Sequence, residues 1–388
     1  MKSKIVQLLQ NPVNLIGLLV LVVMGISFQS ISLGSKTFIP DGIQYTYYNN
    51  YIIFKQSFFH LIQNKDLYIL YPQEYWDLYK YSPTFALMMA PIAYLPDGLG
   101  LFVWNFINAF VLFYALWQLP GQDSKKFLLI LAFMIVELFT SLQNSQSNGL
   151  MAGLMILAFN HLEKKQIIWA SLCIVLTVVI KIFGLVAFAI FIFYPNKLKS
   201  AIYTIAWTSL LLLVPLLIIA PTQLVFLYKS WLNMLQNDHS ISYGYSVAGW
   251  LYSWFGIETK GLSLLLGAIL LLVPLIFIKN YKDQKFRLLY LASLLIWVVI
   301  FNHKAESPTF IIAIAGVAIW GFNTNKGWLN IALLCFAALF TILSPTDIFP
   351  RSLRQSFVEP YVMKAVPCIL IWFKITWELL TFQKELTK

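Results

Sequence analysis

Asp41 is the acidic residue best placed in this chain for catalysis. It follows the first strongly hydrophobic segment, at the start of residues 32–97, which are aromatic-rich and poorly hydrophobic. A carboxylate at the boundary between water and bilayer can accept a proton from the hydroxyl group of a substrate. Apolar and aromatic residues at helical spacing over residues 43–61 predict an interfacial helix that holds Asp41 against the membrane surface. The alternative is an ordinary solvated loop residue.

Three ionisable residues, His303, Lys304 and Glu306, lie close together after a later hydrophobic segment. Ionisable residues are costly near a bilayer and usually mark a functional site. Lys and protonated His bind phosphate oxygens well, so we expect His303 and Lys304 to contact a lipid phosphate. An exit loop in which Lys304 extends toward the headgroups is the alternative.

Lys181 and Glu137 are charged residues of hydrophobic segments. Lys181 ends one segment, where it could bind the same phosphate, although a lysine at a helix end more often extends into the headgroup region. Glu137 lies inside another segment, and an intramembrane acid generally faces a cavity or a partner. The sequence names no partner for Glu137. We expect Asp66, Glu74 and Asp77 of the first loop to be solvated.

The elements that position these residues are predicted to be membrane helices. The chain is 60% hydrophobic and 11% charged, whereas about a quarter of the residues in soluble domains are charged. A helix that spans a bilayer needs roughly 20 mostly apolar residues, which favours an all-α polytopic membrane protein with one transmembrane catalytic domain over residues 1–388. The predicted spans are residues 13–31, 98–119, 126–142, 147–162, 166–182, 183–195, 201–220, 261–279, 286–302, 307–321, 328–344 and 361–380.

Basic residues in the short loops predict the orientation of these helices. Alternate loops and the two chain ends carry Lys or Arg, whereas residues 143–148 carry none. Cytoplasmic loops are enriched in Lys and Arg, so both termini are expected in the cytoplasm. Residues 32–97 and 221–260 are then external loops, and residues 84–94 form a juxtamembrane helix. The candidate site residues therefore gather on the outer face, which we expect to be the periplasmic face of a bacterial inner membrane.

The same sequence argues against several other functions. The net charge of +11 is distributed over short loops with no long basic block, so no nucleic-acid partner is expected. The three cysteines lie in apolar segments and predict no disulfide or metal cluster. No zinc-protease, redox, nucleotide-binding or dinucleotide-binding motif is present. No D-x-D pair that would hold a metal against a nucleotide diphosphate occurs, so the sequence predicts neither a metal nor a cofactor.

Several motifs resemble glycosyltransferase family 87, the polyprenol-phosphate-dependent enzymes of GT-C fold related to bacterial mannosyltransferases. In the first loop the resemblance runs from Asp41 through Asn64-Lys65-Asp66-Leu67-Tyr68 and Tyr81-Ser82-Pro83-Thr84-Phe85 to Trp104. Residues 145–150 are similar to the family's GQ-x-N stretch, with Ser145 in place of Gly. Residues 180–184 are similar to its aliphatic-Lys-x-x-Pro stretch, with Gly184 in place of Pro. Residues 302–307 occupy the place of its late His/Glu motif, and the resemblance covers most of residues 13–320.

This resemblance implies an inverting transfer of a hexose, with mannose favoured, from a polyprenyl-phosphate donor to a lipid or glycan acceptor. The fold implied is a GT-C bundle of about 12 transmembrane helices, with a long first external loop that carries juxtamembrane helices. Asp41 would be the general base, and Lys181, His303 and Lys304 would bind the donor phosphate. The residues expected to line the acceptor cavity are Glu306, Gln146, Asn148, Tyr81 and Glu137.

Two other functions remain open from the sequence. A transporter or flippase for a lipid-linked glycan would bind the same headgroup in a polar cavity. Such proteins are often built from inverted repeats, and none is visible here. A ligase or polymerase that moves a whole glycan from a pyrophosphate lipid is expected to have its large external loop late in the chain, whereas this chain has it early. Transfer from a polyprenyl-phosphate sugar without added metal would distinguish the first function.

Overall fold

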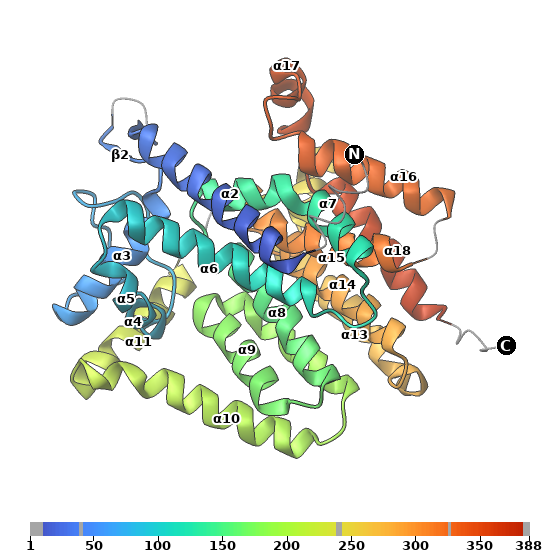
Figure 1. The fold of residues 1–388 in the computed structure, drawn as a ribbon, viewed down its shortest axis with the longest axis horizontal. Helices are drawn as coiled ribbons and strands as arrows, with labels where there is room; N and C mark the ends of the chain where they lie inside the picture. The colour runs from blue at the N-terminus through green and yellow to red at the C-terminus, as the bar shows by residue number, and fades with distance from the viewer. Residues whose placement is uncertain (1–10, 39–41, 238–242, 325–326, 383–388) are drawn as a thin grey trace. The chain divides into compact units, whose positions relative to one another are not determined.

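The computed structural model describes residues 11–38, 42–237, 243–324 and 327–382, and almost all of its regular structure is helical (Figure 1). The chain forms two compact units. Unit 1 comprises Met1–Pro120, Phe139–Leu185 and Leu198–His239, and unit 2 comprises Gly121–Leu138, Val186–Lys197 and Ser240–Lys388. Each unit is described by itself below.

Most of unit 1 is built from helices in the first half of the chain. These elements are α2 (Pro12–Ser32), β1 (Ser35–Thr37), β2 (Gln44–Thr46), α3 (Asn49–Ile62), α4 (Pro83–Met88), α5 (Ala90–Ala93), α6 (Asp97–Trp117), α8 (Asn148–Glu163), α9 (Ile167–Ile180), α10 (Lys197–Leu213), η2 (Val214–Leu217) and α11 (Pro221–Asn237). The helix α7 (Ser124–Gln143) and the 3-10 helix η1 (Ile182–Phe193) each contribute residues to both units.

Close packing of α8 against α6 forms the core of unit 1. Side chains added at Gly149 and Gly153 would lie 3.0 Å from the carbonyl oxygen of Asn108 and 2.8 Å from the backbone nitrogen of Leu112. Small residues four positions apart permit such close approach of membrane helices. Asn108 also accepts a hydrogen bond from the backbone N–H of Leu150 at 3.1 Å. The position of α8, which begins at Asn148, is therefore fixed by α6.

The first loop differs from the sequence prediction at its start. The structure begins α3 at Asn49, whereas we expected an interfacial helix from residue 43. Residues 44–46 instead form β2, which pairs antiparallel with β1, with Lys36 opposite Tyr45. The apolar residues before residue 49 have helical spacing, which is why a helix was predicted there. They form a strand instead because they pair with residues 35–37, a contact that the spacing does not show. The expected juxtamembrane helix over residues 84–94 is found as the two short helices α4 and α5, since Pro91 lies at the start of the second.

The helix α11 of the predicted second external loop packs against the first loop within unit 1. The hydroxyl of Ser230 donates to Asp66 at 2.9 Å, and the indole of Trp231 donates to the carbonyl oxygen of Lys80 at 3.3 Å. Glu74 lies 2.9 Å from the ring of His60. Asp66 is half-buried and bonded, so it is not the freely solvated residue that we expected, whereas Glu74 and Asp77 are exposed as expected, and Asp77 pairs with Lys80.

Unit 2 is built around a buried helix pair in the last third of the chain. Its elements are α12 (Val247–Phe255), α13 (Lys260–Leu272), η3 (Val273–Ile276), η4 (Ile278–Asn280), α14 (Gln284–Ile300), η5 (Ser307–Thr309), α15 (Phe310–Asn323), α16 (Trp328–Phe336), η6 (Ala337–Leu343), α17 (Arg351–Leu353), η7 (Arg354–Val358) and α18 (Val366–Leu380). Gly316 lets α15 approach α14, because a side chain there would lie 2.6 Å from the carbonyl oxygen of Ala292. The helix α18 packs on both.

Four helices in the described part of the chain are long and apolar enough to cross a bilayer, namely Val13–Ser32, Asp97–Trp117, Ser124–Gln143 and Lys197–Leu217. Every other predicted span coincides with a shorter helical segment. The most apolar window of Lys197–Leu217 is only 11% buried within the protein, as expected of a surface that faces lipid. Together with the composition, these helices identify an integral membrane protein.

Candidate active site

The loop between α7 and α8, residues 144–147, is held in place by two elements of unit 1. The indole N–H of Trp104 on α6 donates to the carbonyl oxygen of Ser145 at 2.8 Å. The side-chain amide of Asn50 on α3 donates to the carbonyl oxygen of Asn144 at 2.9 Å. The helix that follows Asp41 in the sequence is thus bonded directly to the loop that leads into α8.

Lys181 reaches this loop from the end of α9. The backbone leaves the helix at Lys181 in an extended conformation, with φ −141° and ψ 126°. Its Nζ donates to Oδ1 of Asn148 at 2.8 Å, and Nδ2 of Asn148 donates to Oε1 of Gln146 at 2.6 Å. Asn148 is fully buried, so the amide that holds the ammonium group has a fixed orientation.

Aromatic rings lie beside the Lys181 ammonium group. Its Nζ is 5.7 Å from the ring centroid of Tyr81 and 5.7 Å from that of Phe183, within the range of a cation–π interaction. The ring of Tyr81 stacks on Phe85 at a centroid distance of 4.8 Å and meets the edge of Phe54 at 4.9 Å. The packed rings limit where Lys181 can move, which favours a fixed position for its charge.

The turn after Lys181 requires a glycine. A side chain at Gly184 would lie 2.5 Å from the backbone carbon of Thr177 on α9, and the N–H of Gly184 donates to the carbonyl oxygen of Lys181 at 2.8 Å. Proline could not donate this hydrogen bond. The chain therefore turns back sharply on α9 and leaves the lysine side chain directed at Asn148.

Four of the residues selected from the sequence thus come together in unit 1: Lys181, Asn148, Gln146 and Tyr81. A half-buried ammonium group beside an amide and a phenol can bind an anionic oxygen, and charge-assisted hydrogen bonds of this kind are the strong ones. The arrangement has the chemistry of a phosphate site. A role in binding the donor phosphate stays a prediction.

His303, Lys304 and Glu306 lie in unit 2, in the loop between α14 and η5. The backbone N–H of Lys304 donates to Oδ1 of Asn302 at 3.0 Å. Glu306 is exposed, whereas His303 and Lys304 are half-buried. Their expected contact with the donor phosphate, and that of Glu306 with the acceptor, stay predictions.

The segment before α12 packs on this loop. The N–H of Tyr245 donates to the carbonyl oxygen of Ala305 at 2.9 Å. Gly244 has a φ of +58°, and a side chain there would lie 2.6 Å from the carbonyl oxygen of His303. The segment just before α12 and the His303–Glu306 loop are therefore packed together within unit 2, and a glycine is needed where they meet.

Asp41, the predicted general base, lies outside the described residues. Lys36 and Phe38 precede it in the sequence and are described, and the Nζ of Lys36 is 4.7 Å from the ring centroid of Phe38. Burial lowers the pKa of Lys36. Phe38 in turn stacks on Trp76 at a centroid distance of 5.7 Å.

Glu137 has a buried partner that the sequence analysis did not identify. Its Oε1 lies 2.6 Å from the Nζ of Lys364, and the exposed fractions of the two side chains are 0% and 2%. Both residues belong to unit 2. The signal in the sequence was a lysine, Lys364, inside the apolar segment 361–380, together with a lone acid inside another segment. The pair gives Glu137 a packing role, and its expected part in an acceptor cavity stays a prediction.

Within the described part of the chain, no three His, Cys, Asp or Glu side chains are grouped so that they could hold a metal ion. The cysteines Cys173, Cys335 and Cys368 are all free.

The model of glycosyltransferase family 87 matches residues 79–301. The match spans more than half of the chain, and the protein belongs to this family of glycosyltransferases. Tyr81, Gln146, Asn148 and Lys181 lie within the matched residues, whereas Asp41 and His303 lie outside them.

No curated protein matches the chain. Among solved structures, the chain is similar to the crystal structure of ArnT from Cupriavidus metallidurans bound to undecaprenyl phosphate. The identity is 13%, the TM-score is 0.40, and the similarity covers 95% of this chain and 77% of that one.

The structure shows the backbone at the two positions that depart from the family's motifs. Ser145, which replaces a glycine, has a φ of +52°, a left-handed conformation that favours glycine and costs other residues about 1–3 kcal/mol. Gly184, which replaces a proline, is the residue whose N–H and lack of a side chain the turn uses. The loop geometry is therefore compatible with the family pattern at Ser145, while the turn at Gly184 depends on the departure.

Proposed function

We propose that this glycosyltransferase moves a hexose, with mannose favoured, from a polyprenyl-phosphate donor to an acceptor hydroxyl on the extracytoplasmic face of the membrane. The observation that carries the proposal is the Lys181 site, in which an ammonium group is held by Asn148 beside Tyr81 within the residues matched by the family. A lipid phosphate is the group that such a site would bind in a family of glycosyltransferases.

In the proposed reaction, the carboxylate of Asp41 accepts the proton of the acceptor hydroxyl as the oxygen attacks the anomeric carbon. The bond between that carbon and the phosphate oxygen breaks, and polyprenyl phosphate leaves with the bonding electrons. Lys181, His303 and Lys304 would stabilise the negative charge that develops on the leaving phosphate. A single displacement from the side opposite the phosphate inverts the anomeric configuration.

The remaining selected residues belong to the acceptor side of this proposal. Glu306, which is exposed, would contact hydroxyl groups of a lipid or glycan acceptor. Gln146 would do so through its side chain while it accepts the hydrogen bond of Asn148. The inner-membrane location, the periplasmic direction of the site and the cytoplasmic termini are part of the same proposal.

The test is transfer by the purified protein from a short-chain polyprenyl-phosphate mannose, with a chelator present and with product anomers assigned by NMR. We expect transfer with inverted configuration. Asp41→Asn should lower the rate by about 10²–10⁴-fold while donor binding persists. Asp77→Asn is the matched control, because Asp77 is an exposed acid of the same loop, 51% accessible, whose partner is Lys80.

Full activity of Asp41→Asn would remove Asp41 as the base and direct attention to Glu306. An acceptor mixture from the membrane is supplied in the same assay. If the protein then binds the donor but transfers no sugar, the proposed reaction is contradicted. Transfer from a glucose donor in preference to mannose would correct the sugar and leave the mechanism.

A further inference from the structure

Hydrogen bonds fix the backbone on which Tyr81 is carried. The hydroxyl of Tyr68 donates to the carbonyl oxygen of Tyr81 at 2.9 Å. The N–H of Ser82 donates to the carbonyl oxygen of Val179 on α9 at 3.4 Å. Val179 lies two residues before Lys181, so this bond ties the segment with Tyr81 to the end of the helix that carries the lysine. All of these residues belong to unit 1.

Tyr68 is itself held in place by its neighbours. Its side chain is 5% exposed and packs against Tyr79 at a centroid distance of 5.8 Å. Its N–H donates to Oδ1 of Asp66 at 3.0 Å, and the hydroxyl of Ser230 on α11 lies 2.9 Å from both carboxylate oxygens of that residue. Burial raises the pKa of Tyr68 well above its usual value, so the phenol keeps the proton that it donates.

The helix α11 supports the same backbone at a second point. The indole N–H of Trp231 donates to the carbonyl oxygen of Lys80 at 3.3 Å, one residue before Tyr81. Trp231 directly follows Ser230. Two adjacent residues of α11 therefore stabilise the segment of the first loop that reaches the Lys181 site.

The same backbone decides what lies beside the ammonium group of Lys181. The ring centroid of Tyr81 is 5.7 Å from its Nζ, near the limit of about 6 Å for a cation–π interaction. A shift of the ring away from Nζ would end this contact. The Nζ also donates to Oδ1 of Asn148 at 2.8 Å. A lysine that loses one of its contacts has more freedom before a ligand binds, and ordering it on binding lowers the affinity.

We propose that Tyr68 and Trp231 are positioning residues for Tyr81. By fixing the backbone of Tyr81, they hold its ring against the ammonium group of Lys181 and keep that group in place for the donor phosphate. This inference rests on the proposed function, because it takes a lipid phosphate as the ligand of Lys181. Neither positioning residue touches a reacting atom.

The experiment measures the affinity of the full-length protein in detergent for farnesyl phosphate by native mass spectrometry. Tyr68→Phe removes the hydroxyl and keeps the ring, and we expect a dissociation constant about three- to tenfold higher than that of the wild type, the effect of losing one hydrogen bond. Tyr45→Phe is the matched control. Tyr45 is a 7% exposed tyrosine of the same loop, and its hydroxyl donates to the carbonyl oxygen of Pro72 at 2.7 Å. This variant loses the same kind of bond and should bind like the wild type.

A double-mutant cycle tests whether Tyr68 acts through the ring of Tyr81. Tyr81→Leu removes the ring and keeps the backbone carbonyl that accepts the hydrogen bond. In this background Tyr68→Phe should change the dissociation constant by less than about twofold. A purely structural effect of the Tyr68 hydroxyl would be equally large in both backgrounds.

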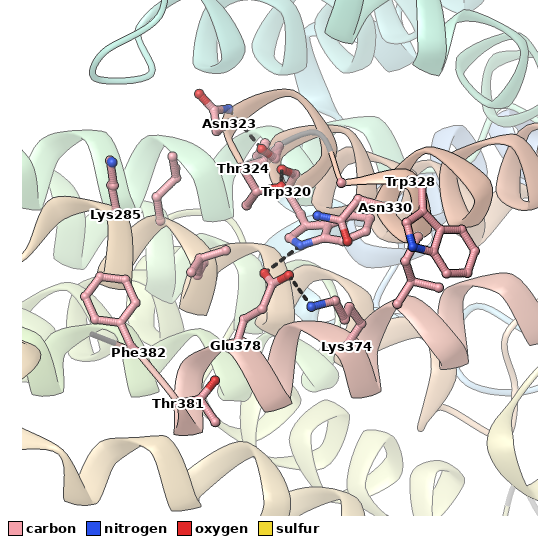
Figure 2. A pocket seen from close by; sticks show the side chains of 15 residues that line it. Lys285, Trp320, Asn323, Thr324, Trp328, Asn330, Lys374, Glu378, Thr381 and Phe382 are labelled. Carbon is pink, nitrogen blue, oxygen red and sulfur yellow. Dashed lines mark hydrogen bonds and ion pairs between the residues drawn. The ribbon is translucent and has the colours of Figure 1, made fainter. Parts of the chain in front are cut away.

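A second variant tests the support from α11. Trp231→Phe removes the indole N–H that reaches Lys80, and it should also weaken binding of farnesyl phosphate. Trp320→Phe is the matched control, because Trp320 is 1% exposed and its indole N–H donates to Oε2 of Glu378 at 2.9 Å. This contact lies in the wall of a cavity in unit 2, where Lys374 also pairs with Glu378 (Figure 2). The control should keep the wild-type affinity.

Weaker binding in Tyr68→Phe and Trp231→Phe, with both controls at the wild-type affinity and no effect of Tyr68→Phe beside Tyr81→Leu, would support the proposal. Equal affinities of Tyr68→Phe and Tyr45→Phe would overturn it and leave the proposed function intact. A wild type that does not bind farnesyl phosphate would overturn both the phosphate site and this proposal, whereas binding without transfer would contradict the proposed reaction alone. Thermal unfolding of each variant sets a temperature at which it and its control are both folded, and binding is compared there.

Discussion

Lys181 shows how much of a site a sequence motif can predict. Lys181 was predicted to be a site residue because it ends an apolar segment and matches the family pattern. Gln146 and Asn148 were predicted to be site residues from a second motif. The structure joins these motifs through side-chain contacts to Asn148. The contact could not be derived from the sequence, because it depends on α8 and α9 running antiparallel so that their distant ends meet.

Replacing Lys181 tests its charge. Lys181→Met keeps the length and apolar character of the side chain, and loss of a charge-assisted contact of about 1.5–3 kcal/mol should weaken donor binding or lower turnover roughly 10- to 150-fold. Lys80→Met is the control, because Lys80 is an accessible lysine that pairs with Asp77. Donor saturation curves of purified variants measure the effect. A Lys181→Met curve that overlays the wild type would remove Lys181 from the donor site.

His60 predicts a dependence of stability on pH. Burial lowers its pKa below the usual 6.5, while Glu74 at 2.9 Å opposes the shift and Lys65 adds to it. The ring also lies against Tyr71 and near Tyr75, with centroid distances of 3.9 and 6.2 Å. The folded first loop therefore favours the neutral imidazole. Its stabilising effect is complete above about pH 6.5 and is lost as the pH falls through the lowered pKa.

Thermal unfolding between pH 7.5 and 5.5 measures this dependence. The wild type should lose more stability over that interval than His60→Gln. The control His161→Gln changes a histidine whose Nδ1 bonds Gln166 on the surface, and it should keep the wild-type slope. A slope in His60→Gln that equals the wild type would contradict the assignment.

At the scale of elements, the twelve predicted apolar segments are all helical, but several boundaries needed the structure. The start of α3 was predicted too early. Helical periodicity does not reveal that residues 44–46 pair with residues 35–37 as strands. Residues 84–94 were predicted to form one juxtamembrane helix, and they form the two short helices α4 and α5, the second of which has Pro91 at its start. Polar residues far apart in the chain, such as Asp66 and Ser230, could not be paired from sequence.

The contact of α6 with α8 gives a prediction about helix packing. Gly153→Ala places a methyl group 2.8 Å from backbone atoms of α6, so the helices must move apart at a cost of about 1–3 kcal/mol. Gly25→Ala in α2 is the matched control, since nothing lies within 4 Å of its added atom. It should be neutral or slightly stabilising, because alanine favours a helix more than glycine. The measurement is the unfolding temperature of each variant in detergent. A higher unfolding temperature for Gly153→Ala than for Gly25→Ala would contradict the packing argument.

At the scale of the whole molecule, the class of protein was predictable because composition alone excludes a soluble domain. The buried pair of Glu137 and Lys364 could not be predicted from the sequence, because 227 residues separate its two members. The family match over residues 79–301 establishes a glycosyltransferase. The sugar and acceptor depend on contacts that the motifs leave undetermined.

The orientation of the chain in the membrane is the prediction that the proposed function depends on most. Gln143 and Lys164 are exposed residues on either side of α8, a helix of 16 residues that is about 24 Å long. Lys181 contacts Asn148 at the Gln143 end, so an external Gln143 implies an external Lys181 site. The loop with Lys164 is basic and should be cytoplasmic.

Cysteine labelling tests this orientation. Gln143→Cys and Lys164→Cys are made singly in a background in which Cys173, Cys335 and Cys368 are replaced by serine. A membrane-impermeant maleimide applied to cells with an intact inner membrane should label Gln143→Cys and should label Lys164→Cys only after lysis, because the two positions lie at opposite ends of α8. Labelling of both before lysis would contradict the alternation of the spans. Labelling of Lys164→Cys alone would place the Lys181 site in the cytoplasm, where the proposed extracytoplasmic transfer could not occur.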